Sequence, residues 1–79
     1  MTIQLSLYST SHCHLCEQAE VIIARVAQHL DIVCTVIEIA DDPELLTLYE
    51  VKIPVLRRPD TLAEIYWPFS IDDIYQLLK

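Results

Sequence analysis

Two cysteines separated by two residues, Cys13 and Cys16, are the most reactive pairing in this 79-residue chain. They follow an alternating apolar stretch, residues 3–8, that predicts a strand, and they open an amphipathic stretch that predicts a helix running to about Leu30. The unsatisfied N–H groups and the positive dipole end at a helix N-terminus stabilise a thiolate. The spacing and placement therefore predict a redox dithiol that closes into a small disulfide ring.

The position of each cysteine in this helix predicts its chemical role. Cys13 is expected at or just before the first turn with the more exposed sulfur, whereas Cys16 lies one turn later and is more buried. The attacking thiolate is then Cys13, and Cys16 resolves the mixed disulfide. Zinc sites use the same spacing, but a structural zinc site usually takes four Cys or His ligands, and no metal site is expected here. The third cysteine, Cys34, is expected to be a small core residue of a buried strand.

Composition excludes several classes of protein. Five Lys and Arg against twelve Asp and Glu give a net charge of −7, which leaves too few cations to track a nucleic-acid backbone. No apolar run approaches the roughly 20 residues of a membrane span, and the N-terminus lacks the basic region of a signal peptide. We therefore expect a single domain over residues 1–79, monomeric, in a reducing cytoplasm where C-x-x-C motifs are more often catalytic than structural.

Hydrophobic patterns, together with capping and turn residues, predict the remaining elements. Residues 32–39 are almost continuously apolar, which predicts a strand buried on both faces and parallel to the first strand. Asp42-Pro43 predicts an N-cap and a short helix to about Glu50. Two strands, 51–56 and 62–67, are expected to form a hairpin around Pro59-Asp60, and residues 70–73 resemble a capping box that opens a last helix. Because the chain has no glycine, we expect few turns with positive φ.

These motifs resemble the glutaredoxins over essentially the whole chain. The resemblance rests on Leu7-Tyr8-Ser9 leading into the dithiol, on Ile53-Pro54-Val55 and on the capped terminal helix. It implies an α/β fold, the minimal thioredoxin fold with order βαβαββα, in which helices flank a four-stranded mixed sheet. It further implies a cis Pro54 against the dithiol, backbone pairing of Ile53 with the substrate, and a substrate-binding role for Asp72 and Asp73, which match the family's acidic pair.

The chain departs from the glutaredoxin pattern around the dithiol. His14 and Leu15 stand where Pro-Tyr is usual, Phe69 and Ser70 replace a Gly-Gly pair, and no fixed cation precedes Cys13. His12 and His14 are expected to modulate the Cys13 thiolate.

The resulting hypothesis is a thiol–disulfide oxidoreductase that acts on a disulfide-containing protein or on glutathione. It needs no cofactor, takes glutathione as a possible co-substrate, and draws its electrons from a thiol reductant system. Two alternatives stay open: a metal or iron–sulfur carrier that uses His12, His14 and Cys16, and a thioredoxin-fold adaptor that docks through Trp67, Pro68 and Phe69.

Overall fold

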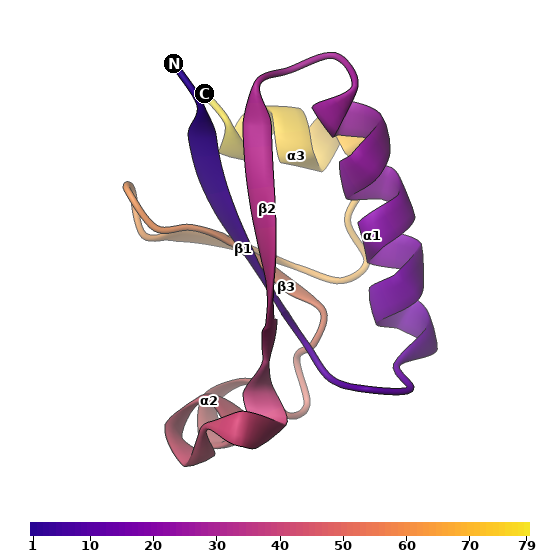
Figure 1. The fold of residues 1–79 in the computed structure, drawn as a ribbon, viewed down its shortest axis with the longest axis vertical. Coiled ribbons are helices and arrows are strands. Elements are labelled where there is room, and N and C mark those ends of the chain that lie inside the picture. Colours follow the sequence, from indigo (N-terminus) through magenta and orange to yellow (C-terminus); the bar gives the residue numbers. More distant parts are fainter.

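The computed structural model describes all of residues 1–79 (Figure 1). The elements along the chain are, in order, β1 (Ile3–Ser9), α1 (His14–Ala27), β2 (Ile32–Glu38), the one-turn 3-10 helix η1 (Ile39–Asp41), α2 (Pro43–Tyr49), β3 (Val55–Arg58), β4 (Ala63–Tyr66) and α3 (Ile71–Leu77). Apart from η1, this is the βαβαββα order that the sequence predicts. None of the helices is long and apolar enough to cross a membrane.

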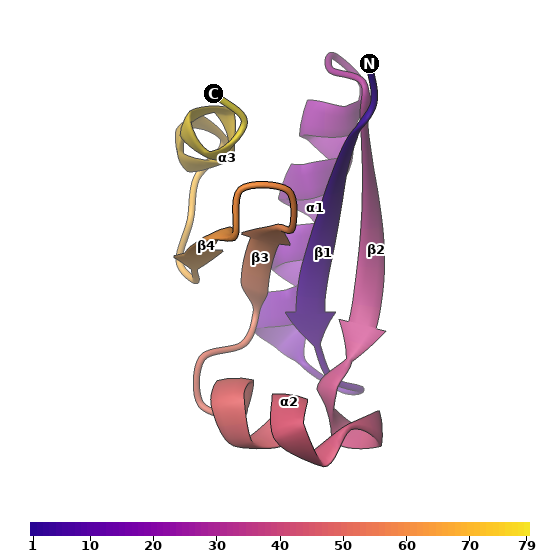
Figure 2. The ribbon, with the colours of Figure 1, turned by 90° about the vertical axis from the view of Figure 1, so that its left-hand side faces the viewer.

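The four strands form one mixed sheet in the order β2-β1-β3-β4. β1 and β2 are parallel, while β1 and β3, and β3 and β4, are antiparallel. In Figure 2, α1 lies behind the sheet and α2 lies beneath it, where β1 and β2 end. The carboxyl ends of the two parallel strands therefore meet at the end of the molecule where α1 begins.

Alternation along the strands divides the core into two clusters on opposite faces of the sheet. Leu7 of β1 belongs to the larger cluster, beneath α1 and α3, and its neighbour Tyr8 belongs to the smaller one, beneath α2. The larger cluster consists of Leu5, Leu7, Ala19, Ile23, Val26, Ile32, Leu56, Phe69, Ile74 and Leu77. The smaller cluster consists of Tyr8, Ile39, Tyr49 and Val55. The core is thus extensive on one face of the sheet and confined to one end of the other.

The predicted helix starts are confirmed. The Asp42 carboxylate accepts hydrogen bonds from the N–H groups of Glu44 and Leu45, and Pro43 occupies the first turn of α2. Ser70 caps α3, and Asp73 completes a reciprocal capping box with it. These short polar side chains satisfy N–H groups that the helices themselves leave without partners.

The prediction that β2 is buried on both faces is wrong. β2 is an edge strand, and the side chains of Val33 and Val36 are 48% and 50% exposed. Val33 lies on the face that α2 covers only at its end. Val36 shares the α1 face with Leu7, but at the edge of the sheet it lines a surface hollow beside α1 instead of the core. Cys34 is half-buried and packs against the larger core cluster from the edge of the sheet.

Three element boundaries also differ from the sequence prediction. α1 ends at Ala27 and the chain then turns, with Leu30 donating its N–H to Val26. β3 begins only at Val55, because the N–H groups of Lys52 and Ile53 both donate back to the Tyr49 carbonyl and turn the chain. β4 begins after Leu62, which has φ 64°. Positive φ is indeed rare, and occurs only at His12 and Leu62.

Candidate active site

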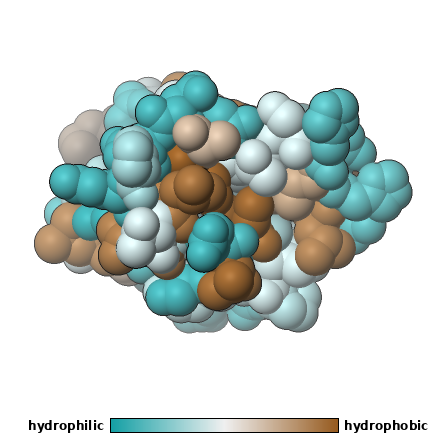
Figure 3. Space-filling view, turned by 90° about the horizontal axis from the view of Figure 1, so that it is seen from below, coloured by the Kyte–Doolittle hydropathy of each residue, from teal (hydrophilic) through white to brown (hydrophobic).

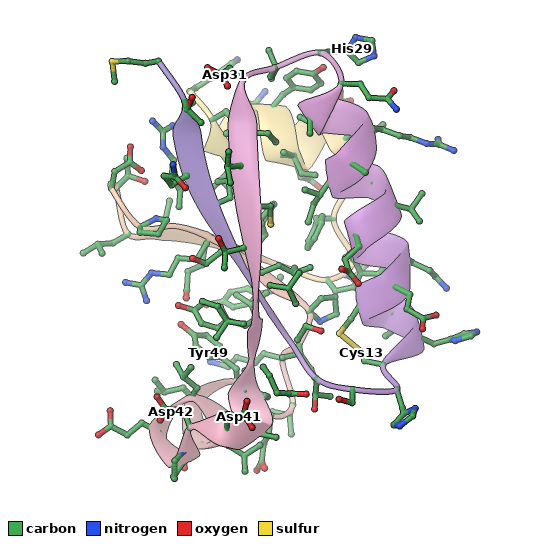
Figure 4. The ribbon with its side chains drawn as sticks, in the orientation of Figure 1. Cys13, His29, Asp31, Asp41, Asp42 and Tyr49 are labelled. Carbon is green, nitrogen blue, oxygen red and sulfur yellow. A yellow bond between two sulfur atoms is a disulfide. The ribbon has the colours of Figure 1, made fainter.

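The two cysteines of the C-x-x-C motif form a disulfide at the N-terminus of α1, with their Cα atoms 5.2 Å apart. Cys13 is the N-cap residue, and its sulfur accepts the backbone N–H of Cys16 at 3.2 Å. Cys13 is half-buried, whereas Cys16 is only 2% exposed, which confirms the predicted difference in accessibility. Figure 4 shows the bond at the start of α1, at the same end of the molecule as α2.

The loop that leads into the dithiol is held by a carboxylate from the neighbouring strand. The Ser11 N–H and the Ser11 hydroxyl both donate to Oε1 of Glu38, each at 2.9 Å, and the Ala40 N–H donates to Oε2 at 3.2 Å. Hydrogen bonds from the Thr10 side chain and from the Ala40 N–H hold the pKa of the Glu38 carboxyl below its usual value. Glu38 is therefore ionised at neutral pH and joins the end of β2 to the dithiol loop.

Pro54 lies at the same end of the sheet as the dithiol. Val55 pairs with Tyr8 in the antiparallel β1–β3 register, which places Pro54 opposite the Ser9 end of β1. The Ile53–Pro54 peptide bond is cis, and the Pro54 carbonyl accepts the Trp67 N–H at 3.2 Å. Ile53 packs against the smaller core cluster, so its side chain is fixed while its backbone borders the dithiol end of the molecule.

The space-filling view of this end shows what surrounds the site. Hydrophobic residues gather near the middle of the surface, with hydrophilic residues around them (Figure 3). At this end, α2 and the turn that follows expose the apolar side chains of Leu46, Leu48 and Val51. The end of the molecule that carries the dithiol therefore also carries exposed apolar side chains of α2 and the turn after it.

The family model described as "Glutaredoxin-like domain (DUF836)" matches residues 4–79. The chain belongs to this glutaredoxin-like family. It is also similar to a solved structure, the X-ray structure of the Northeast Structural Genomics target protein XcR50 from X. campestris. The two chains are 35% identical with a TM-score of 0.80, and the match covers 94% of this chain and 93% of that one. No protein with a curated description matches the chain.

In this glutaredoxin-like chain, Asp72 and Asp73 do not join the dithiol. Ile71, the first residue of α3, shares a surface hollow with residues 25–29 at the far end of α1. Cys13 is more than ten residues away along that helix, on the order of 15 Å at the α-helical rise. Asp73 also accepts the Ser70 N–H at 2.8 Å, so its carboxylate is used as a cap. The acidic pair that the resemblance singled out is placed by the structure at the start of α3, remote from the reactive sulfurs.

His12 and His14 flank Cys13 without forming a shared site with it. His14 is 91% exposed and its Nδ1 lies 3.6 Å from a carboxylate oxygen of Glu17, one turn along α1. His12 adopts φ 61° in the turn just before Cys13. No three His, Cys, Asp or Glu side chains are grouped so that they could hold a metal ion.

The aromatic docking patch that the adaptor alternative needs is exposed only in part, at Pro68 and to a lesser degree at Trp67. Phe69 is 5% exposed in the larger core cluster, and Trp67 packs edge-on against it with ring centroids 5.1 Å apart. Tyr8 of β1 stacks on Tyr49 of α2, with ring centroids 4.5 Å apart. Lys52 lies 5.7 Å from the centre of the Tyr66 ring, so its ammonium group is directed towards β4.

Sequence reasoning missed Glu38 and Ser11. A signal was present, because Glu38 ends a strand predicted to run parallel to β1, and the carboxyl ends of parallel strands meet at one edge of the sheet.

Proposed function

We propose that this chain is a thiol–disulfide oxidoreductase of glutaredoxin-like type. The observation that carries the proposal is the asymmetry of the dithiol: Cys13 offers a partly accessible sulfur at the N-cap, hydrogen-bonded by the Cys16 N–H, and Cys16 is buried one turn behind it. A thiolate at Cys13 would be stabilised by that N–H and by the helix dipole. Membership of the glutaredoxin-like family supports the same chemistry.

The reaction begins with the reduced dithiol. The Cys13 thiolate attacks one sulfur of a substrate disulfide, forms a mixed disulfide and expels the other substrate sulfur as a thiolate, which takes a proton from solvent. Cys16, once deprotonated, attacks the Cys13 sulfur and expels the second substrate sulfur. The substrate gains two electrons, and the chain is left with the Cys13–Cys16 disulfide that the structure contains. Two electrons from a thiol reductant return it to the dithiol.

The groups around the dithiol suggest how a substrate is oriented. The Ile53 N–H is already donated to the Tyr49 carbonyl at 3.1 Å, whereas the Ile53 carbonyl accepts no hydrogen bond within the chain. We infer that this carbonyl receives an N–H from an extended substrate segment beside Pro54. We propose that His12 and His14, which flank Cys13 in the sequence, modulate its thiolate.

The substrate class follows from the same chemistry. We propose a protein disulfide or a glutathione mixed disulfide as substrate, glutathione or another thiol system as reductant, and no resident cofactor. The reducing cytoplasm is the compartment in which such a cycle would run. Since Asp72 and Asp73 are remote from the dithiol, glutathione would have to bind through Cys13 and the Ile53 backbone rather than through the acidic pair.

Two cysteine variants test the function. Cys13→Ser should reduce the turnover of glutathione disulfide to background, because it removes the attacking sulfur. Cys16→Ser should accumulate a mixed disulfide on Cys13, which intact-mass spectrometry after thiol trapping would show as a glutathione adduct. Equal residual turnover in the two variants, or no reversible loss of two protons in the wild-type chain, would disprove the assignment.

A further inference from the structure

Glu38 makes an unusual number of contacts for a side chain at the surface end of a strand. Its two carboxylate oxygens accept three hydrogen bonds at 2.9–3.2 Å, two from Ser11 and one from Ala40. Ser11 lies 27 residues away in sequence and two residues before Cys13. One carboxylate thus ties the dithiol loop to the β2–η1 corner.

The segment held by Glu38 has to adopt a constrained conformation. His12, between Ser11 and Cys13, has φ 61°, a region that non-glycine residues occupy at a cost and only where their surroundings hold them there. The next residue, Cys13, must then place its sulfur where it accepts the Cys16 N–H. Without glycine at residue 12, the loop depends on the bonds at residue 11 to keep Cys13 at the N-cap.

We propose that Glu38 is a positioning residue for the reactive cysteine: by fixing residues 10–12, its carboxylate holds the Cys13 sulfur at the N-cap of α1 and so sets how far that sulfur is stabilised as a thiolate. The inference rests on the proposed function, because the stability of the Cys13 thiolate matters only if that thiolate attacks a disulfide. It assigns Glu38 a part in the chemistry without contact with the substrate.

The charge of Glu38 and its positioning role have opposite effects on the Cys13 thiol. A nearby anion disfavours a thiolate, so removal of the charge alone would lower the pKa of Cys13. Loss of the loop anchor would instead let the sulfur leave the Cys16 N–H, which would raise that pKa. The direction of the change therefore separates the two effects in one measurement.

The test is the pH dependence of alkylation at Cys13 in the reduced chain, read by peptide mass spectrometry after timed treatment with iodoacetamide. Glu38→Ala should slow alkylation about tenfold at a pH below the pKa of Cys13, since one pKa unit is a tenfold change in thiolate fraction. Ser11→Ala, which removes only the hydroxyl donor, should shift the profile in the same direction by less. Glu38→Gln keeps an acceptor for the Ser11 N–H and should alkylate at the wild-type rate or faster.

Two controls separate positioning from charge and from general stability. Glu17→Gln removes an anion from the first turn of α1 without touching the loop, so it should not slow alkylation. Ser70→Ala weakens the cap of α3, remote from the dithiol, and should lower Tm while leaving the Cys13 profile unchanged. If Glu38→Ala folds poorly, the alkylation rates of Ser11→Ala and Glu38→Gln are compared instead. The proposal then requires that Ser11→Ala is alkylated more slowly than Glu38→Gln.

The proposal is overturned if Glu38→Ala or Ser11→Ala leaves the profile unchanged or speeds alkylation, or if Ser70→Ala slows it as much as they do. Failure of the proposed function would look different. The wild-type chain would then not cycle between dithiol and disulfide, although its Cys13 alkylation profile could still be measured.

Discussion

At the scale of single residues, the environment of each sulfur determines its reactivity. Cys34 lies half-buried in a hollow of about 250 Å³ between α1 and β2, whose lining is apolar except for Glu20. Burial, and secondarily the negative charge of Glu20, raises the pKa of Cys34 from 9.0 to about 11. This sulfur has neither a helix N-terminus nor an N–H donor, so nothing stabilises its thiolate.

We therefore expect Cys34 to be nearly inert in the folded chain. In the oxidised protein it is the single free thiol, so iodoacetamide uptake followed by intact mass reports on it alone. At neutral pH its alkylation should be about 100-fold slower than that of an ordinary thiol, because two pKa units are a hundredfold change in thiolate fraction. The same protein unfolded in guanidinium serves as control and should recover the ordinary rate. Equal rates in the folded and unfolded protein would contradict this account.

The reactive residues of the candidate site differ in how far the sequence predicts them. Cys13 and Cys16 are predictable because spacing and placement at a helix start are local features. Glu38 is harder to predict, since its partner Ser11 lies 27 residues away and only the shared edge of two parallel strands links them. The motif match predicts a substrate-binding role for Asp73, whereas the structure shows it in the capping box that the local sequence also predicts.

At the scale of elements, α3 depends on its N-terminal cap. The helix spans only seven residues, too few to be stable without packing and capping, and the Ser70–Asp73 box satisfies two donors reciprocally. Ser70→Ala should lower the free energy of unfolding by about 1 kcal/mol, measured by urea denaturation. Gln76→Ala, at an exposed position of the same helix, should change it by less than about 0.5 kcal/mol. A loss no larger than that of the control would mean that the packing of Ile74 and Leu77 alone fixes α3.

The order of the elements could be predicted, but their burial and ends could not. Helical periodicity and the caps at Asp42 and Ser70 are encoded locally, which is why α1, α2 and α3 were predicted correctly. The exposure of β2 depends on strand order, because its apolar residues would suit a central strand equally well. The late start of β3 depends on the Tyr49 carbonyl, which takes two N–H groups that a strand would otherwise use.

At the scale of the whole molecule, the two faces of the sheet are unequally stabilised. Ten buried residues hold α1 and α3 to one face, whereas four hold α2 to the other. The smaller cluster is supplemented by polar contacts: the Tyr49 hydroxyl donates to Glu64, which also accepts the Tyr66 hydroxyl at 2.9 Å and lies 3.9 Å from Arg57. Local stability follows buried apolar contact, so α2 should be the first element to open.

Hydrogen exchange under native conditions measures this difference directly. The bonded amides of Leu46 in α2 and of Glu50 at its C-cap should exchange through a partial opening, with a free energy a few kcal/mol below that of Leu5 and Leu7 in β1. Tyr49→Phe keeps the stacked ring but removes the hydrogen bond to Glu64. It should therefore lower the free energy of opening of α2, and this decrease should exceed any decrease measured for β1 by about 1 kcal/mol. Tyr66→Phe is the matched control, because it removes a hydroxyl from the same carboxylate without touching α2.

This opening would bear on the proposed chemistry. Tyr49, at the end of α2, supplies the carbonyl that accepts the Ile53 N–H. A partial opening of α2 would therefore free this N–H for a substrate strand, while α1 kept the dithiol in place. The Tyr49→Phe variant should then show a lower KM for a peptide disulfide and an unchanged rate of Cys13 alkylation. If α2 and β1 instead exchange with the same free energy and the same dependence on denaturant, the molecule opens as one unit. The Ile53 N–H then stays committed to Tyr49, and the substrate must be bound through the Ile53 carbonyl alone.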